Sequence, residues 1–326
     1  MKSEYENFIK DLNKNLILIN KAKLSIKKKR YNSFFIVTPP RGASMFFQQI
    51  LVSFTKIGYV SNLMASFWDY PELGAILQKK FLNYENLISN FKSKNGNTDG
   101  VFEPHEWGYF WRKWLDIPSR DCYYNTKSKI KWKKLNNKLI TIKNILGLPT
   151  VFKTPYVNTY FKEFKKNIDS AKYIFIFRSP YAVCNSICNA RIKKFNNINK
   201  FYSSKPKKLI AFENMNSPIE EVIAQVYFII KEMLEFKSIL SKQDYIILKY
   251  EDLFTSSNKI IEKMIKFTTN DFSLYSKKRK ISKYPIESFS SNFKNKNKTI
   301  FFDKNFKKEF DFYYDKYFKN FEYDET

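Results

Sequence analysis

Two short stretches combine an arginine with a hydroxyl-bearing residue where the chain can hold an oxyanion. The first follows the apolar run SFFIVT at 33–38 and consists of Pro40, Arg41, Gly42, Ala43, Ser44 and Met45. A strand, a tight turn and a helix start aim backbone N–H groups at one point, which stabilises an anion there. The guanidinium of Arg41 can donate two parallel hydrogen bonds to phosphate or sulfate oxygens. Taken alone, the stretch also fits an ordinary turn that happens to carry an arginine.

The second stretch follows YIFIF at 173–177, the run with the strongest strand character in the chain. Arg178 comes directly after it, and a helix is expected to begin at Pro180, because proline favours the first helical position. Ser186 then falls about two turns into this helix and can face the same cleft as Arg178. An arginine with a hydroxyl suits a phosphate group. The alternative is a strand-end arginine and a small helix residue with no ligand.

The first stretch resembles the loop with which sulfotransferases bind the 5′-phosphosulfate of their donor PAPS (3′-phosphoadenosine-5′-phosphosulfate). The family pattern is Pro-Arg/Lys-Ser-Gly-Thr/Ser-Thr, and Pro40, Arg41 and Ser44 fit it. Gly42-Ala43 replaces the usual Ser-Gly order and Met45 replaces the last hydroxyl residue. Ala43 therefore has to adopt a backbone conformation that favours glycine, or the turn shifts by one residue.

The second stretch resembles the family's 3′-phosphate motif, Arg-Asp/Asn-Pro with a serine eight residues after the arginine. Arg178, Pro180 and Ser186 match that spacing, with Ser179 in place of Asp. The segments VFKTP (151–155) and IILKYEDL (246–253) resemble two further family segments, so the resemblance covers 33–255. It implies PAPS as co-substrate, PAP as product and no metal. Lys153 resembles the family lysine that approaches the transferring group.

A general base is expected in the segment FEPHEWGYFW (102–111), whose Phe-Glu-Pro start resembles a stretch in carbohydrate sulfotransferases. The family uses His or Glu for this role, and the segment holds Glu103, His105 and Glu106. His105 is the first choice because its ordinary pKa is nearest neutrality. Aromatic neighbours can line an acceptor pocket and raise the pKa of a carboxyl by desolvation. A structural cluster at a helix start is the alternative.

The elements that position these residues alternate between strands and helices, which predicts right-handed crossovers and a mostly parallel sheet. Ligands of such sheets lie beyond the carboxyl ends of the strands, where both arginine stretches fall. We expect an α/β three-layer fold with a mostly parallel central sheet flanked by helices, in the P-loop NTPase-like sulfotransferase architecture that the resemblance implies. We expect a single domain over 1–326, with a helical lead-in at 1–30, the motif-bearing core at 33–255 and a basic aromatic tail at 270–326.

The formal net charge of +27 raises a basic nucleic-acid-binding protein as a competing function. The basic residues are spread along the chain, and Lys, Asn, Ile, Phe and Tyr are all abundant while Gly numbers 7, as AT-rich codons produce. Nucleic acid is therefore not the expected partner. A nucleotide kinase or NTPase on a similar sheet is the other alternative, but the first turn lacks the Lys-Ser/Thr pair of ATP-type loops and with it the usual magnesium ligand.

Cysteine and histidine usage argues against a zinc site, because Cys122, Cys184 and Cys188 form no CxxC pair and His105 is the single histidine. Sparse cysteine suits a reducing compartment. No apolar run reaches the roughly 18 residues of a membrane span, and the first residues lack a signal-peptide pattern. We expect a cytoplasmic protein acting on a small-molecule or carbohydrate acceptor. The sequence leaves the identity of the acceptor and the oligomeric state open.

Overall fold

The fold was analysed in a computed structural model, which describes residues 2–19, 29–94, 96–118, 129–210, 215, 217–281 and 303–321. Five parallel strands form its central sheet in the order β2-β5-β1-β6-β7. Their bounds are Gly58–Tyr59 for β2, Thr150–Lys153 for β5, Ser33–Val37 for β1, Ala171–Phe177 for β6 and Tyr245–Lys249 for β7. The predicted mostly parallel α/β sheet is thereby confirmed.

The central strand β1 is apolar along most of its length because both of its faces are covered. Phe34 and Ile36 face one layer of helices, and Phe35 and Val37 face the other. The register aligns Ile36 of β1 with Lys153 of β5. The strands thus end side by side, and the turns that follow them share one edge of the sheet.

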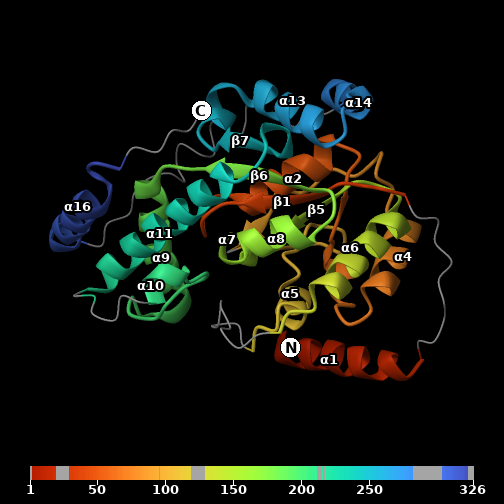
Figure 1. Cartoon of the computed structure of the whole chain (residues 1–326), viewed down its shortest axis with the longest axis horizontal. Coiled ribbons are helices and arrows are strands. Elements are labelled where there is room, and N and C mark those ends of the chain that lie inside the picture. The colour runs from red at the N-terminus through yellow and green to blue at the C-terminus, as the bar shows by residue number, and fades with distance from the viewer. Residues whose placement is uncertain are drawn as a thin grey trace.

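Helices cover both faces of the sheet (Figure 1). The upper layer in that view contains α2 (Ser44–Phe54), α13 (Ser257–Thr268) and α14 (Ser273–Ile281). The opposite layer contains α5 (Gly108–Trp114), α6 (Trp132–Leu146), α7 (Tyr156–Thr159), α8 (Phe161–Asn167), α9 (Pro180–Phe195) and α11 (Pro218–Ser238). The described residues therefore build the three-layer arrangement expected from the alternation of strands and helices.

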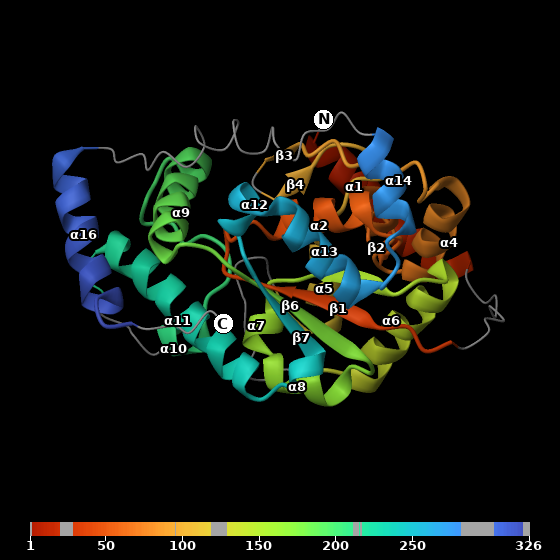
Figure 2. The same cartoon turned by 90° about the horizontal axis from the view of Figure 1, so that it is seen from above.

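The remaining described elements lie around this core. They are α1 (Lys2–Ile19), α3 (Asn62–Ala65), α4 (Pro71–Phe81), β3 (Ser93–Lys94), β4 (Asn97–Thr98), α10 (Lys207–Ile210), η1 (Lys242–Asp244), α12 (Asp252–Thr255) and α16 (Lys304–Phe318). β3 and β4 pair as a small antiparallel hairpin. At one end of the molecule, α16 lies beside α9 and α11 in both views (Figures 1 and 2), where Lys316 forms an ion pair with Glu220 at 2.7 Å.

Two parts of the chain are more regular than their polar composition suggests. The stretch at 118–135 is polar and Lys-rich, yet its last residues begin α6; residues 119–128 lie outside the described ranges. The tail after 270 contains α14 and α16, while 282–302 lie outside the described residues. Cys184 and Cys188 are free and buried in α9. Within the described ranges, no helix combines the length and the apolarity that crossing a bilayer requires.

Candidate functional site

The turn between β1 and α2 is held in an unusual backbone conformation. Arg41 and Ala43 both have positive φ, 65° and 68°, on either side of Gly42. The Gly42 N–H donates to the Pro39 oxygen at 3.0 Å, and a β-carbon on Gly42 would lie only 2.0 Å from Thr38 Oγ1. Ala43 therefore adopts the glycine-favouring conformation that the sequence requires if the turn is not to shift.

The start of α2 presents backbone donors at this turn. The first N–H groups of a helix have no acceptor within the helix. The N-cap residue, Ala43, has no side chain that caps them. These amides and the helix dipole favour an anion at this end of α2. The Arg41 guanidinium lies at the same turn and supplies a full positive charge.

Arg178 follows the last residue of β6 and reaches this turn directly. Its Nη1 donates to the backbone oxygen of Arg41 at 2.8 Å, and its guanidinium lies over the ring of Tyr250, 4.5 Å from the ring centre. The Tyr250 N–H donates to the Phe177 oxygen at 2.8 Å, which fixes the ring beside β6. Burial lowers the pKa of Arg178, with Tyr250 and Glu251 acting in the opposite direction.

The helix after Arg178 brings Ser186 to the same point. The Ser179 side chain caps α9 by accepting from the Ala182 N–H at 3.4 Å, and the Ser179 N–H donates to Glu251 Oε1 at 3.0 Å. Ser179 thus serves as a helix cap where the family pattern has Asp. Two turns along α9, Ser186 Oγ accepts from Arg41 Nε at 3.0 Å. The structure therefore brings together Arg41, Arg178 and Ser186.

Lys153 connects this cluster to the segment around His105. Its side chain is 8 % exposed, and its ammonium forms an ion pair with Glu106, whose side chain is 42 % exposed. Burial and the nearby charge of Arg41 lower the pKa of Lys153 to about 7. The Glu106 carboxylate acts in the opposite direction, because a neighbouring negative charge favours the protonated amine. Lys153 is thus held between an arginine and a carboxylate.

His105 is fixed by two backbone contacts. Its own N–H donates to the Val60 oxygen at 2.8 Å, and its Nδ1 accepts from the Trp107 N–H at 2.8 Å. In a neutral imidazole that accepts at Nδ1, the proton sits on Nε2. Burial and the charge of Lys153 lower the pKa of His105 to about 4. Near neutral pH, His105 is therefore an uncharged ring with neither nitrogen ready to take up a proton.

Glu103 is buried and fully engaged with its neighbours. Its Oε2 accepts from Ser89 Oγ at 2.6 Å and from Gln49 Nε2 at 3.1 Å, and its Oε1 accepts from the Asn90 N–H at 2.8 Å. These contacts join α2 to the loop at 89–90. The structure thus separates the three candidate bases, since Glu106 has an exposed carboxylate beside Lys153 while Glu103 braces the scaffold.

Tyr250 and Glu251 were not singled out by sequence reasoning, although their segment was recognised as similar to one in the family. Their position could have pointed to them, because both residues directly follow β7 at the same edge of the sheet as Arg178. Asn158 was also missed; its Nδ2 donates to the Thr38 oxygen at 3.2 Å and supports the turn after β1. Among the residues that the structure describes, no group of three or more His, Cys, Asp or Glu can hold a metal ion.

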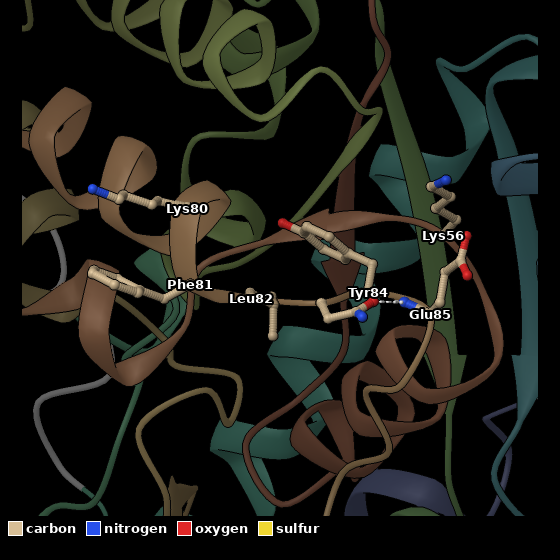
Figure 3. A pocket seen from close by; sticks show the side chains of 7 residues that line it. Lys56, Lys80, Phe81, Leu82, Tyr84 and Glu85 are labelled. Carbon is tan, nitrogen blue, oxygen red and sulfur yellow. Dashed lines mark hydrogen bonds between the residues drawn. The ribbon is translucent and has the colours of Figure 1, made fainter.

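A separate depression of about 430 Å³ is formed by a residue that follows α2, by the last residues of α4 and by the chain after α4 (Figure 3). It is lined by Lys56, Lys80, Phe81, Leu82, Asn83, Tyr84 and Glu85. None of the residues singled out from the sequence lines it. This hollow is therefore distinct from the cluster around Arg41 and Arg178.

No protein-family model matches the sequence, and no curated protein matches it. Among solved structures, a sulfotransferase of Mycobacterium avium aligns with a TM-score of 0.51 at 10 % identity, covering 97 % of this chain and 82 % of that one. A sulfotransferase domain from the curacin biosynthetic pathway aligns with a TM-score of 0.40 at 16 % identity, covering 82 % of this chain and 98 % of that domain. The first of these alignments spans nearly the whole chain and agrees with the parallel sheet described above. On this basis, the chain has the sulfotransferase fold.

Proposed function

We propose that this chain is a sulfotransferase that transfers a sulfuryl group from PAPS to a hydroxyl or amine of a small-molecule or carbohydrate acceptor. One observation carries the proposal: Arg41, at one strand end, is hydrogen-bonded both to Arg178, at another strand end, and to Ser186, on a helix. Positive charge, a hydroxyl and an uncapped helix start converge at that point. This combination suits a nucleotide with phosphates at two positions.

The donor would be held at two ends. Arg41 and the amides at 42–45 would bind the 5′-phosphate, and Arg178 with Ser186 would bind the 3′-phosphate. The stacking of Arg178 on Tyr250 and the capping of α9 by Ser179 support this assignment, because they fix both partners before a ligand arrives. Prepositioned donors need no reorganisation when charge develops.

The reaction itself is an in-line displacement at sulfur. A bond forms between the acceptor oxygen or nitrogen and sulfur, while the bond between sulfur and the 5′-phosphate oxygen breaks. The electron pair of the broken bond leaves with the phosphate, giving PAP. Lys153 and Arg41 would stabilise the charge that builds on this phosphate, and removing one such donor costs on the order of 3 kcal/mol.

The acceptor proton would pass to Glu106 in this proposal. Sequence reasoning put His105 first, but its Nδ1 accepts from the Trp107 N–H and its pKa is about 4. Glu103 accepts three hydrogen bonds and is buried. Glu106 alone of the three candidates combines a carboxylate that is 42 % exposed with a contact to Lys153. A positioned base contributes roughly 10²- to 10⁴-fold.

The test is a transfer assay with ³⁵S-labelled PAPS and a panel of sugars, phenols, amines and peptides. Transfer of label to one acceptor class without added metal is the expected result, with the rate falling at least about 100-fold in Glu106→Gln. If the protein instead transfers a phosphoryl group from ATP in the presence of magnesium, it is a kinase and the proposal is wrong. Lack of PAPS chemistry together with nucleic-acid binding of steep salt dependence would favour the basic nucleic-acid-binding alternative.

A further inference from the structure

A glycine in the β3–β4 hairpin lies directly against the Glu106–Lys153 ion pair. Gly96 directly precedes β4 and has a φ of +85°, a conformation that residues with side chains rarely adopt. A β-carbon added there would lie 3.0 Å from Glu106 Oε1 and 3.8 Å from Lys153 Nζ. The first distance is tighter than ordinary packing, so a side chain at this position would press on the Glu106 carboxylate.

The hairpin is anchored to the segment that carries Glu106. Thr98 Oγ1 donates to the Pro104 oxygen at 2.8 Å, and Asn62 Nδ2 lies 3.1 Å from Thr98 Oγ1 and 2.7 Å from the Gly100 oxygen. These bonds tie β4 to α3 and to the residues just before Glu106. Figure 2 labels the two short strands of the hairpin. These hydrogen bonds therefore hold β4, and with it Gly96, in place next to the segment that carries Glu106.

The backbone on the other side of Glu106 is fixed as well. Trp107 is 1 % exposed and has a φ of 57°, which is costly for a bulky residue. Its ring packs on Phe110 and Trp111, and its N–H is bonded to His105. Since the backbone next to Glu106 cannot move freely, the remaining freedom of the carboxylate is in its side-chain rotation. That rotation is limited by Lys153 and by Gly96.

We propose that Gly96 is a positioning residue: having no side chain, it lets the hairpin close onto Glu106, holds the carboxylate against Lys153 and forms one wall of the acceptor site. The role of Gly96 as a wall of the acceptor site rests on the proposed function, because only a transferase has an acceptor. The positioning itself concerns the ion pair and can be measured without one. A β-carbon at 96 would force the Glu106 carboxylate to shift by a few tenths of an ångström beside the ammonium.

The ionisation of Lys153 reports this contact. The charged groups around Lys153 are Glu106 on one side and Arg41 on the other, with neutral His105 nearby. Moving the Glu106 carboxylate away from the ammonium weakens the influence of a negative neighbour, so the pKa of Lys153 falls further. Competitive labelling of amines with trace acetic anhydride over a pH series, resolved by peptide mass spectrometry, gives this pKa for Lys153 alone.

Two variants at Gly96 and two controls make the experiment decisive. Gly96→Ala adds a side chain and backbone strain, whereas Gly96→Asn adds a side chain that tolerates positive φ. Glu106→Gln sets the size of the effect when the anion is absent. Gly147→Ala controls for strain, since Gly147 ends α6 with a φ of +73° and the nearest atom to its added β-carbon is Lys79 Nζ at 3.9 Å.

Both Gly96 variants are expected to lower the pKa of Lys153 toward the value in Glu106→Gln, with Gly147→Ala matching the unmodified protein. A wild-type pKa in both Gly96 variants overturns the proposal. A lowered pKa in Gly96→Ala alone also overturns it, because strain rather than the side chain would then be the cause.

Stabilisation by 3′,5′-ADP is measured in parallel. Its absence in wild type would defeat the proposed function and leave the positioning result intact. With an acceptor in hand, the variants should raise the acceptor KM or lower kcat.

Discussion

The guanidinium of Arg178 donates a hydrogen bond to the backbone oxygen of Arg41 at 2.8 Å, although 137 positions separate the two residues. The bond joins the ends of the adjacent strands β1 and β6. It also turns the carbonyl side of the strained Arg41 peptide toward Arg178, while the Arg41 side chain extends to Ser186 at 3.0 Å. One arginine thus supports the backbone of the other, and the two motifs form a single cluster.

The turn after β1 carries a strain that can be removed. Ala43 has a φ of 68°, and glycine adopts this conformation without the penalty that a β-carbon brings. Ala43→Gly should therefore raise the free energy of unfolding by about 1 kcal/mol, after allowing for the greater entropy of the unfolded chain. Urea denaturation measures the change. A loss of stability in Ala43→Gly would show that the turn does not hold this conformation in solution.

Substitution of Glu103 should mainly lower the stability of the protein, whereas substitution of Glu106 should mainly lower its activity. Replacing Glu103 by Gln breaks a buried set of three hydrogen bonds and should cost about 2 kcal/mol of unfolding free energy. Glu106→Gln should change stability far less, because its side chain is 42 % exposed, yet it should abolish most transfer activity. Parallel urea and PAPS assays make the comparison. The opposite pattern, with Glu103→Gln stable but inactive, would reassign the base.

The affinity for 3′,5′-ADP should depend on the charge of Lys153. Its pKa is about 7, so above that pH the free protein carries a neutral amine. An anionic ligand favours the protonated form, so binding above pH 7 takes up a proton and the affinity falls as the pH rises. Isothermal titration calorimetry in buffers of different ionisation enthalpy measures both effects. Lys153→Met should bind more weakly and lose this pH dependence; affinity that is flat from pH 7 to 9 in wild type would contradict the assignment.

Acid should destabilise the protein through His105. Its pKa is about 4 in the folded chain against an ordinary value of 6.5, so the unfolded chain binds the extra proton between these values. The free energy of unfolding therefore falls as the pH drops from 6.5 toward 4. Denaturation across this range should show a shallower slope in His105→Gln than in wild type. Equal slopes would mean that the ring is not buried beside Lys153.

The functional stretches were predictable because each follows a short apolar run and begins with a residue that breaks it. Arg41, Arg178 and Lys153 all lie within a residue or a few residues of such strand ends, and parallel strands bring their ends to one edge. The stacking of Arg178 on Tyr250 joins parts of the chain far apart in sequence, so no local pattern announces it. The β3–β4 hairpin also gives no clear signal in the sequence, because its polar residues lack the apolar alternation that marks a strand.

The helix α6 was missed for a different reason. Its buried residues Leu135, Leu139, Ile142 and Leu146 recur at helical spacing, but many lysines and asparagines lie between them. In a chain this rich in Lys and Asn, polar residues occupy exposed helix faces as well as loops. The apolar spacing was the informative signal, and the polar composition hid it.

The central claim is that Arg41 and Arg178 bind the two phosphates of one nucleotide, and a thermal-shift series tests it most directly. Wild type, Arg178→Ala and Arg41→Ala are each unfolded with 3′,5′-ADP, with 5′-AMP and without ligand. The account predicts the largest rise in melting temperature for wild type with 3′,5′-ADP, and a loss in Arg178→Ala of the advantage that 3′,5′-ADP has over 5′-AMP. Arg41→Ala should weaken the response to both nucleotides. Equal stabilisation of wild type by 3′,5′-ADP and 5′-AMP, or no stabilisation by either, would contradict the account.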